Sequence, residues 1–199
     1  MTLQIAQDDT ADEVLSTSAF ALLSGMLLDQ QFPMERAFAG PAKILDRFGT
    51  LDPVTIAAAP AEEFAEICAR PPAVHRYPGS MAVRLQALAQ HIVTEYDGDT
   101  ATLWQTAGTG HDLLTRLQAL PGFGRQKSQI FVALLGKQLG VQPDGWSEAA
   151  GSYAEPGSFR SVADVRGPDS LEKVRAFKKE QKARAKASRP GDATPQSAS

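Results

Sequence analysis

A turn with two glycines, Leu120-Pro121-Gly122-Phe123-Gly124-Arg125, is the feature that most constrains the fold of this chain. It follows a helical pattern over residues 111–119 and leads into an apolar helical run over residues 128–139. The proline stiffens the chain as it leaves the first helix, and both glycines permit positive φ and close approach of another backbone. The turn therefore makes two helices neighbours and leaves backbone N–H groups free at the start of the second, where a phosphate binds well.

Helical periodicity continues through the rest of the chain, with almost no alternating pattern. Apolar residues recur at spacings of three and four over residues 19–27, and Ser16 or Ser18 is a candidate N-cap. We expect the other helical segments at 33–48, 53–56, 60–67 and 80–96, and an ordered loop at 70–79, where three prolines and a glycine interrupt any helix. Helices joined by short loops predict an all-α bundle.

Composition limits the class of protein and its cofactors. A 199-residue chain that is 43% hydrophobic can bury a core as one domain or two closely packed lobes, and we expect a monomer. Neither a leader nor a membrane-spanning run is evident, so the expected location is cytoplasmic, with no membrane partner. The single cysteine, Cys68, excludes a four-cysteine iron–sulfur cluster, and three scattered histidines show no metal-ligand spacing.

Charge is distributed unevenly along the chain. The net charge of −3 argues weakly against nucleic-acid binding. A basic helix is nevertheless predicted at about 170–187; between Glu172 and Arg189 the basic residues are Lys173, Arg175, Lys178, Lys179, Lys182, Arg184, Lys186 and Arg189. This helix is either a solvated surface element or an arm that follows a phosphate backbone. The polar tail at 188–199 is predicted to be disordered.

The hairpin, the basic residues after it and Asp144 together resemble the helix-hairpin-helix-GPD superfamily of DNA glycosylases, base excision repair enzymes that include endonuclease III. The resemblance covers roughly residues 19–146. It implies a glycosylase domain at 1–187, with the hairpin at 120–125, that folds as a helix-hairpin-helix helical bundle. The second lobe is expected to be reduced and to lack an iron–sulfur cluster. It also implies double-stranded DNA with a damaged base as partner, and it leaves open a monovalent cation held by hairpin carbonyls.

Carried onto this chain, the resemblance implies a set of DNA-contacting residues: Gln30, Gln31, Leu120, Gly122, Phe123, Gly124, Arg125, Gln126 and Lys127. Ordinary polarity at a helix C-terminus is the alternative explanation of the two early glutamines. In bifunctional members a lysine that forms a Schiff base stands where this chain has Gln126, so the resemblance implies no strand cleavage. Lys127 is turned by about 100° from that position and is expected to point towards the backbone or solvent.

Asp144 occupies the place of the family's catalytic aspartate. A carboxylate there would stabilise oxocarbenium-like charge on the deoxyribose as the glycosidic bond breaks. The alternative is an N-cap for the helix that follows, and one residue can serve both purposes. The surrounding Gln142-Pro143-Asp144-Gly145-Trp146 departs from the Val-Asp-Thr/Ser pattern common in the family.

Stacking and hydrogen-bonding groups for a flipped base are the last candidates: His75, Arg76, Tyr77, Trp146 and Tyr153. The first three lie on the proline-rich loop, where they are expected to be exposed, although Tyr77 and Trp146 could instead anchor their loops on the core. The leading hypothesis is a monofunctional DNA glycosylase, a hydrolase. The alternatives are a non-catalytic DNA-binding or damage-sensing module and, less favoured, a helical protein–protein adaptor.

Overall fold

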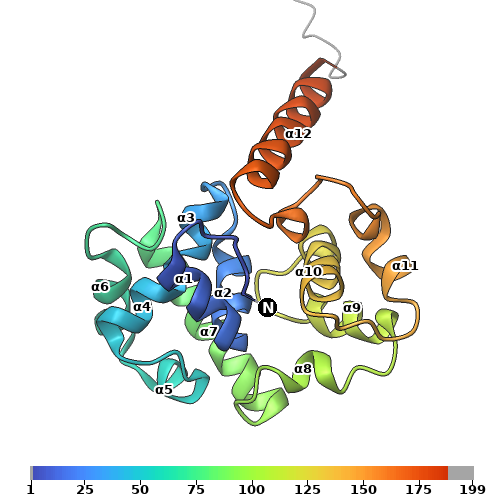
Figure 1. Ribbon diagram of the computed structural model, residues 1–199. Coiled ribbons are helices and arrows are strands. Elements are labelled where there is room, and N and C mark those ends of the chain that lie inside the picture. The colour runs from blue at the N-terminus through green and yellow to red at the C-terminus, as the bar shows by residue number, and fades with distance from the viewer. Residues whose placement is uncertain (1, 188–199) are drawn as a thin grey trace, which may run out of the picture.

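The computed structural model describes residues 2–187, and their regular secondary structure is entirely helical, which confirms the all-α prediction (Figure 1). The predicted tail at 188–199 lies outside these residues. One group of helices comprises α1 (Asp9–Thr17), α2 (Ala19–Leu28), α3 (Met34–Phe38), α4 (Gly40–Phe48), α5 (Pro53–Ala58), α6 (Ala61–Ala69) and α7 (Pro78–Tyr96). The other comprises α8 (Thr102–Gln105), α9 (Gly110–Gln118), α10 (Arg125–Gln138), α11 (Trp146–Ala150), η1 (Gly151–Ala154) and η2 (Val162–Asp164), and α12 (Pro168–Ala187) projects from the body.

Helix α2 is the central element of the first group. Every residue from Phe20 to Leu28 is buried, and the Ser18 hydroxyl caps the helix by accepting the N–H of Ala21, as the sequence predicts. Helix α1, which the sequence analysis missed, packs beside it. Within residues 2–187 no single helix is both long and apolar enough to cross a membrane. Taken together, α1 and α2 would be long and apolar enough by length and composition alone, but the two helices are bent by 117° relative to each other.

The predicted continuous helix over residues 33–48 is wrong, because the structure divides it into α3 and α4. At the division the chain passes very close to its neighbours, and a Cβ added to Gly40 would lie 2.5 Å from Leu28 Cδ1. Pro41 then occupies the first turn of α4, where its missing N–H costs nothing. The break brings α3 against the end of α2, beside the site described below.

The hairpin between α9 and α10 is built as the sequence predicts in most respects. Leu120 and Phe123 are 3% and 4% exposed and fix the turn to the core. Gly122 has a φ of +81°, and its added Cβ would lie 2.6 Å from Leu27 Cδ1, so the turn rests directly on α2. Gly124 does not use the positive φ that a glycine permits: its φ is −80°, and a Cβ added there would meet nothing within 4 Å among the described residues.

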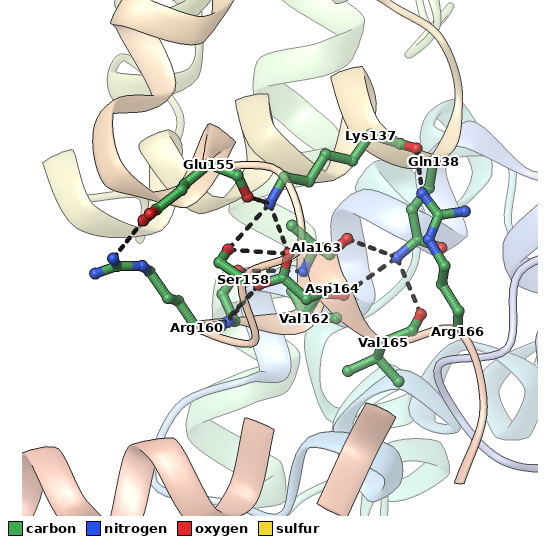
Figure 2. Close-up of polar contacts among 11 residues, drawn as sticks. Lys137, Gln138, Glu155, Ser158, Arg160, Val162, Ala163, Asp164, Val165 and Arg166 are labelled. Atoms are coloured by element: carbon green, nitrogen blue, oxygen red, sulfur yellow. Dashed lines mark hydrogen bonds and ion pairs between the residues drawn. The ribbon is translucent and has the colours of Figure 1, made fainter. Parts of the chain in front are cut away.

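A buried polar network fixes the segment from which α12 departs (Figure 2). The Lys137 ammonium lies 2.6 Å from Asp164 Oδ1, and only 12% and 4% of these side chains is exposed. Asp164 also accepts the backbone N–H of Arg160 at 2.8 Å. Next along α10, the Gln138 amide donates to the carbonyls of Val162, Ala163 and Val165. The end of α10 therefore determines where α12 begins.

Candidate nucleic-acid cleft

A cavity of about 1090 Å³ lies where the two groups of helices meet α12. The end of α2 and the start of α3 contribute residues within 26–35, the first turns of α10 contribute Gln126, Lys127 and Ile130, and α12 contributes residues within 175–182. We call this cavity the cleft. Its volume is slightly above the range of about 300–1,000 Å³ that is typical of ligand sites.

Positive charge is concentrated in the cleft although the chain as a whole is acidic. The basic residues that line it are Arg76, Lys127, Arg175, Lys178, Lys179 and Lys182, against the acids Asp29 and Glu35. The four from α12 follow the spacing that places side chains on one helical face. Arg175 forms an ion pair of 2.6 Å with Glu35, which ties α12 to α3. The basic helix therefore forms a wall of the cleft.

Lys127 is held on the backbone of α2, and it also lines the cleft. Its ammonium donates to the carbonyls of Met26 at 2.8 Å and Leu27 at 3.0 Å. These carbonyls lie at the C-terminal end of α2, where a cation is favoured by the helix dipole. Burial lowers the pKa of Lys127 to about 8, and the nearby Asp29 charge acts in the opposite direction.

The two glutamines after α2 have different environments. Gln30 is held within the protein, since its amide donates to the Leu27 carbonyl at 2.7 Å and its side-chain oxygen accepts from Arg84 at 2.7 Å. Gln31 is exposed, lines the cleft and has a φ of +53°, a backbone conformation that non-glycine residues rarely adopt. Strain of this kind is often found at binding sites, so Gln31 is the better candidate to contact a ligand.

The proline-rich loop is ordered as predicted, but the expectation that His75 is exposed is wrong. His75 is 1% exposed; the Tyr77 N–H donates to its Nδ1, so its Nε2–H donates to the Gln30 carbonyl, at 3.0 Å. Burial lowers the pKa of His75. The imidazole thus positions the glutamine segment, while Arg76 and Tyr77 stay exposed, with the Arg76 guanidinium stacked 4.5 Å from the Tyr77 ring centroid.

The start of α10 presents an open surface. Gly124 is its N-cap and supplies no side chain, and no side chain within residues 2–187 caps this end. Arg125 and Gln126 follow as exposed side chains, and the Gln126 amide donates to the Tyr153 hydroxyl at 2.8 Å. Free N–H groups of a helix start, with space above Gly124, suit an approaching phosphate.

Asp144 lies apart from the cleft. It lines a separate pocket of about 470 Å³ together with Arg125 and Gln129, and its backbone carbonyl accepts the N–H of Gly110 at 2.8 Å. The N-cap interpretation is wrong, because Gly145 is the N-cap of α11 and no side chain among the described residues caps that helix. The ring of Trp146 packs on Gly136, where an added Cβ would lie 2.4 Å away, so this residue anchors its loop on the core.

Asp29 is a cleft residue that the sequence analysis did not select. It is the C-cap of α2 and is partly buried. Desolvation by burial raises the pKa of its carboxyl, and the charges of Lys178 and Lys127 oppose that rise only in part. The available signal was an acidic residue directly after a helix that carries no charge and is almost entirely apolar, where neither solvent exposure nor the helix dipole favours a negative charge.

A glycine hairpin that joins two helices and borders a basic cleft defines a helix-hairpin-helix protein. Residues 24–190 match the family model described as HhH-GPD superfamily base excision DNA repair protein, and the chain belongs to this superfamily. It is therefore a base excision DNA repair protein of a kind that binds DNA. Searches of the curated proteins and of the solved structures found no significant match.

Proposed function

We propose that this protein is a monofunctional DNA glycosylase that flips a damaged base out of double-stranded DNA and hydrolyses its N-glycosidic bond. The observation that carries the proposal is the position of the cleft, which opens between the hairpin helix α10, the exposed Gln31 and the basic face of α12. Membership of a base excision repair family supports the same activity.

The arrangement suits DNA in two ways. Backbone N–H groups at the start of α10 and the cations of α12 bind phosphates, contacts that position a duplex without identifying its sequence. The cleft, at about 1090 Å³, is large enough for one extruded nucleotide. Flipping costs a few kcal/mol of stacking and pairing, and a damaged base loses less of both. Gln31 at the rim would contact the DNA beside the extruded nucleotide.

These side chains favour a monofunctional glycosylase, which releases the base without cleaving the strand. An amide such as Gln126 cannot form a Schiff base with the sugar, and the Lys127 amine is occupied by two backbone carbonyls. We further propose that the protein acts as a monomer in the cytoplasm and needs no iron–sulfur cluster. We also propose that backbone carbonyls of the hairpin bind a monovalent cation.

Motif spacing makes Asp144 the first candidate for the carboxylate that stabilises the sugar cation. Its location beside Arg125 puts it near the hairpin, although outside the residues that line the cleft. An Asp144→Asn variant that releases base as fast as the parent would remove this role.

A panel of duplexes carrying alkylated, deaminated and oxidised bases tests the proposed function. We expect the protein to release at least one damaged base and to leave an abasic site that breaks only after alkali. Borohydride should trap no covalent protein–DNA adduct, because no Schiff base forms. If no duplex in the panel loses a base, the proposed glycosylase activity is contradicted. A trapped adduct would contradict its monofunctional character.

A non-catalytic DNA-binding module is the second candidate, and the location of Asp144 outside the cleft is what favours it. A Gly124→Glu variant separates binding from chemistry, because the added side chain has space in the protein but brings a negative charge to the phosphate position. We expect it to lose duplex binding, while Gly108→Glu, at another exposed glycine with free space, retains it. Tight binding without base release by the parent would favour the module.

A further inference from the structure

The cleft contains two acidic residues with different partners. Glu35 is engaged by Arg175 at 2.6 Å. Asp29 accepts no hydrogen bond and forms no ion pair within residues 2–187, and its surroundings act on it only through burial and through charge at a distance. The charged groups that face it are Lys127 from α10, Lys178 from α12 and Glu35 from α3. Asp29 is thus an unengaged carboxylate on the wall of a basic cleft.

The location of Asp29 is unfavourable for folding on three counts. It is partly removed from solvent, it lacks a hydrogen-bond donor among the described residues, and it stands at the negative end of the α2 dipole. Lys127 offsets this in part by binding the last carbonyls of the same helix. Ionisable groups held in unfavourable positions within a cleft are candidates for a functional role.

Charge on the reacting sugar gives that role a physical reason. Breaking a glycosidic bond develops positive charge on the sugar ring, and a cleft lined by lysine and arginine disfavours such a cation. A fixed carboxylate in a partly desolvated site compensates for this, because electrostatic interactions are stronger where water is excluded. Asp29 is the acid in this cleft whose carboxylate is not already engaged by an arginine.

We propose that Asp29 takes the role that motif spacing assigns to Asp144: its carboxylate faces the extruded nucleotide, stabilises the sugar cation and accepts the proton of the attacking water. This inference rests on the proposed glycosylase function. The C1′–N bond breaks with its electron pair remaining on the base nitrogen. The water oxygen bonds to C1′, its proton passes to Asp29, and Asp29 then transfers the proton to the departing base. The products are a free base and an abasic site that carries a C1′ hydroxyl.

Burial supports this assignment, since it raises the pKa of Asp29 and so makes its carboxylate a stronger base than an exposed aspartate. The position also fits the geometry of the fold. Gln31, two residues further on, would hold the DNA at the rim while Asp29 lies on the cleft wall.

Single-turnover excision with the full chain tests the inference on whichever damaged duplex the parent acts upon. We expect Asp29→Asn to lower the rate at least 100-fold while its Kd for the duplex stays within threefold of the parent value. Glu148→Gln, at an exposed acid that lines the Asp144 pocket, is the matched control and should retain the parent rate. Melting temperatures no lower than that of the parent show that a loss of rate is not a loss of fold.

The pH profile adds a measurement that a structural role would not change. The parent rate should fall at acid pH along a one-proton limb whose midpoint lies above 3.8, and the residual rate of Asp29→Asn should lack this limb. An Asp29→Asn variant as fast as the parent overturns the assignment and leaves the glycosylase proposal intact. A parent that releases no base from any duplex overturns both.

Discussion

A candidate carboxylate lies on each side of the hairpin helix α10, and the two carboxylates have opposite environments. Asp29, on the cleft side, is partly buried and faces two lysines without contacting them. Asp144, on the other side, is exposed, and the hydrogen bond that the structure gives it uses its backbone carbonyl. Motif spacing selects Asp144, whereas environment selects Asp29. Because solvent exclusion and neighbouring charge determine what a carboxylate can do, the comparison favours the cleft side.

The two sides also differ in how they are assembled. The Asp144 pocket forms from α9, the start of α10 and α11, which are close in sequence. The cleft combines α2, α10 and α12, so residues about 150 positions apart in the sequence share its walls. The network at the end of α10 holds the start of its basic wall, and the ion pair between Arg175 and Glu35 ties that wall to α3. The cleft side should therefore be the more sensitive to distant substitutions.

The largest expected effect comes from that network. Asp164→Ala leaves the Lys137 ammonium without its carboxylate and removes the acceptor of the Arg160 N–H. Breaking a buried ion pair costs about 3–5 kcal/mol, which corresponds to a fall in Tm of roughly 6–20 °C for a chain of this size. Thermal unfolding measures it, with Glu172→Ala at an exposed position of α12 as the control. Equal shifts in both variants would show that the network does not position α12.

A smaller effect is expected when the basic wall of the cleft is neutralised. Replacing Lys178, Lys179 and Lys182 by glutamine should weaken duplex binding whatever the sequence of the DNA. The slope of log Kobs against log salt concentration should become shallower by about 0.9 for each phosphate that the protein no longer neutralises. Lys173 is on the same helix but lies over the Phe159 ring at 4.7 Å and does not line the cleft.

Lys173→Gln is therefore the matched control, and it should leave the slope unchanged. Loss of binding to the same degree in both variants would mean that α12 acts through its overall charge and that the cleft has no special role in DNA binding.

Much of this fold could be predicted from local sequence, and the site only in part. Periodicity and turn chemistry identified most of the core helices, α1 excepted, and the hairpin, because these depend on residues that are near in sequence. The break at Gly40 could have been predicted, because Gly40-Pro41 is a dipeptide that interrupts helices. The burial of His75 depends on contacts with distant segments, which no local pattern encodes. Asp29 was overlooked for the same reason: its burial depends on α10 and α12 closing over the end of α2.

The smallest expected effect is that of Asp29→Asn on the stability of the fold, and this effect depends on pH. The pKa of Asp29 is raised in the folded state, so the stability gained from its neutral form is complete below pH 3.8 and is lost as the pH rises through the folded-state value. At pH 7 the folded protein therefore holds an ionised carboxylate at a cost. Asp29→Asn removes that cost and should stabilise the fold by up to about 1 kcal/mol, or roughly 2–4 °C in Tm.

At pH 3 the parent carboxyl is already neutral, so the advantage of Asp29→Asn should disappear or reverse. Asp144→Asn alters an exposed side chain and should stay within about 0.5 kcal/mol of the parent at pH 7. Urea unfolding of the three proteins at both pH values measures these differences. A destabilised Asp29→Asn at pH 7 would mean that Lys127 and Lys178 stabilise the carboxylate more than burial destabilises it, in which case Asp29 would be a structural partner of these lysines. A gain in stability that disappears at pH 3 indicates instead that the fold retains this carboxylate at a cost, as expected where activity requires an unfavourable charge.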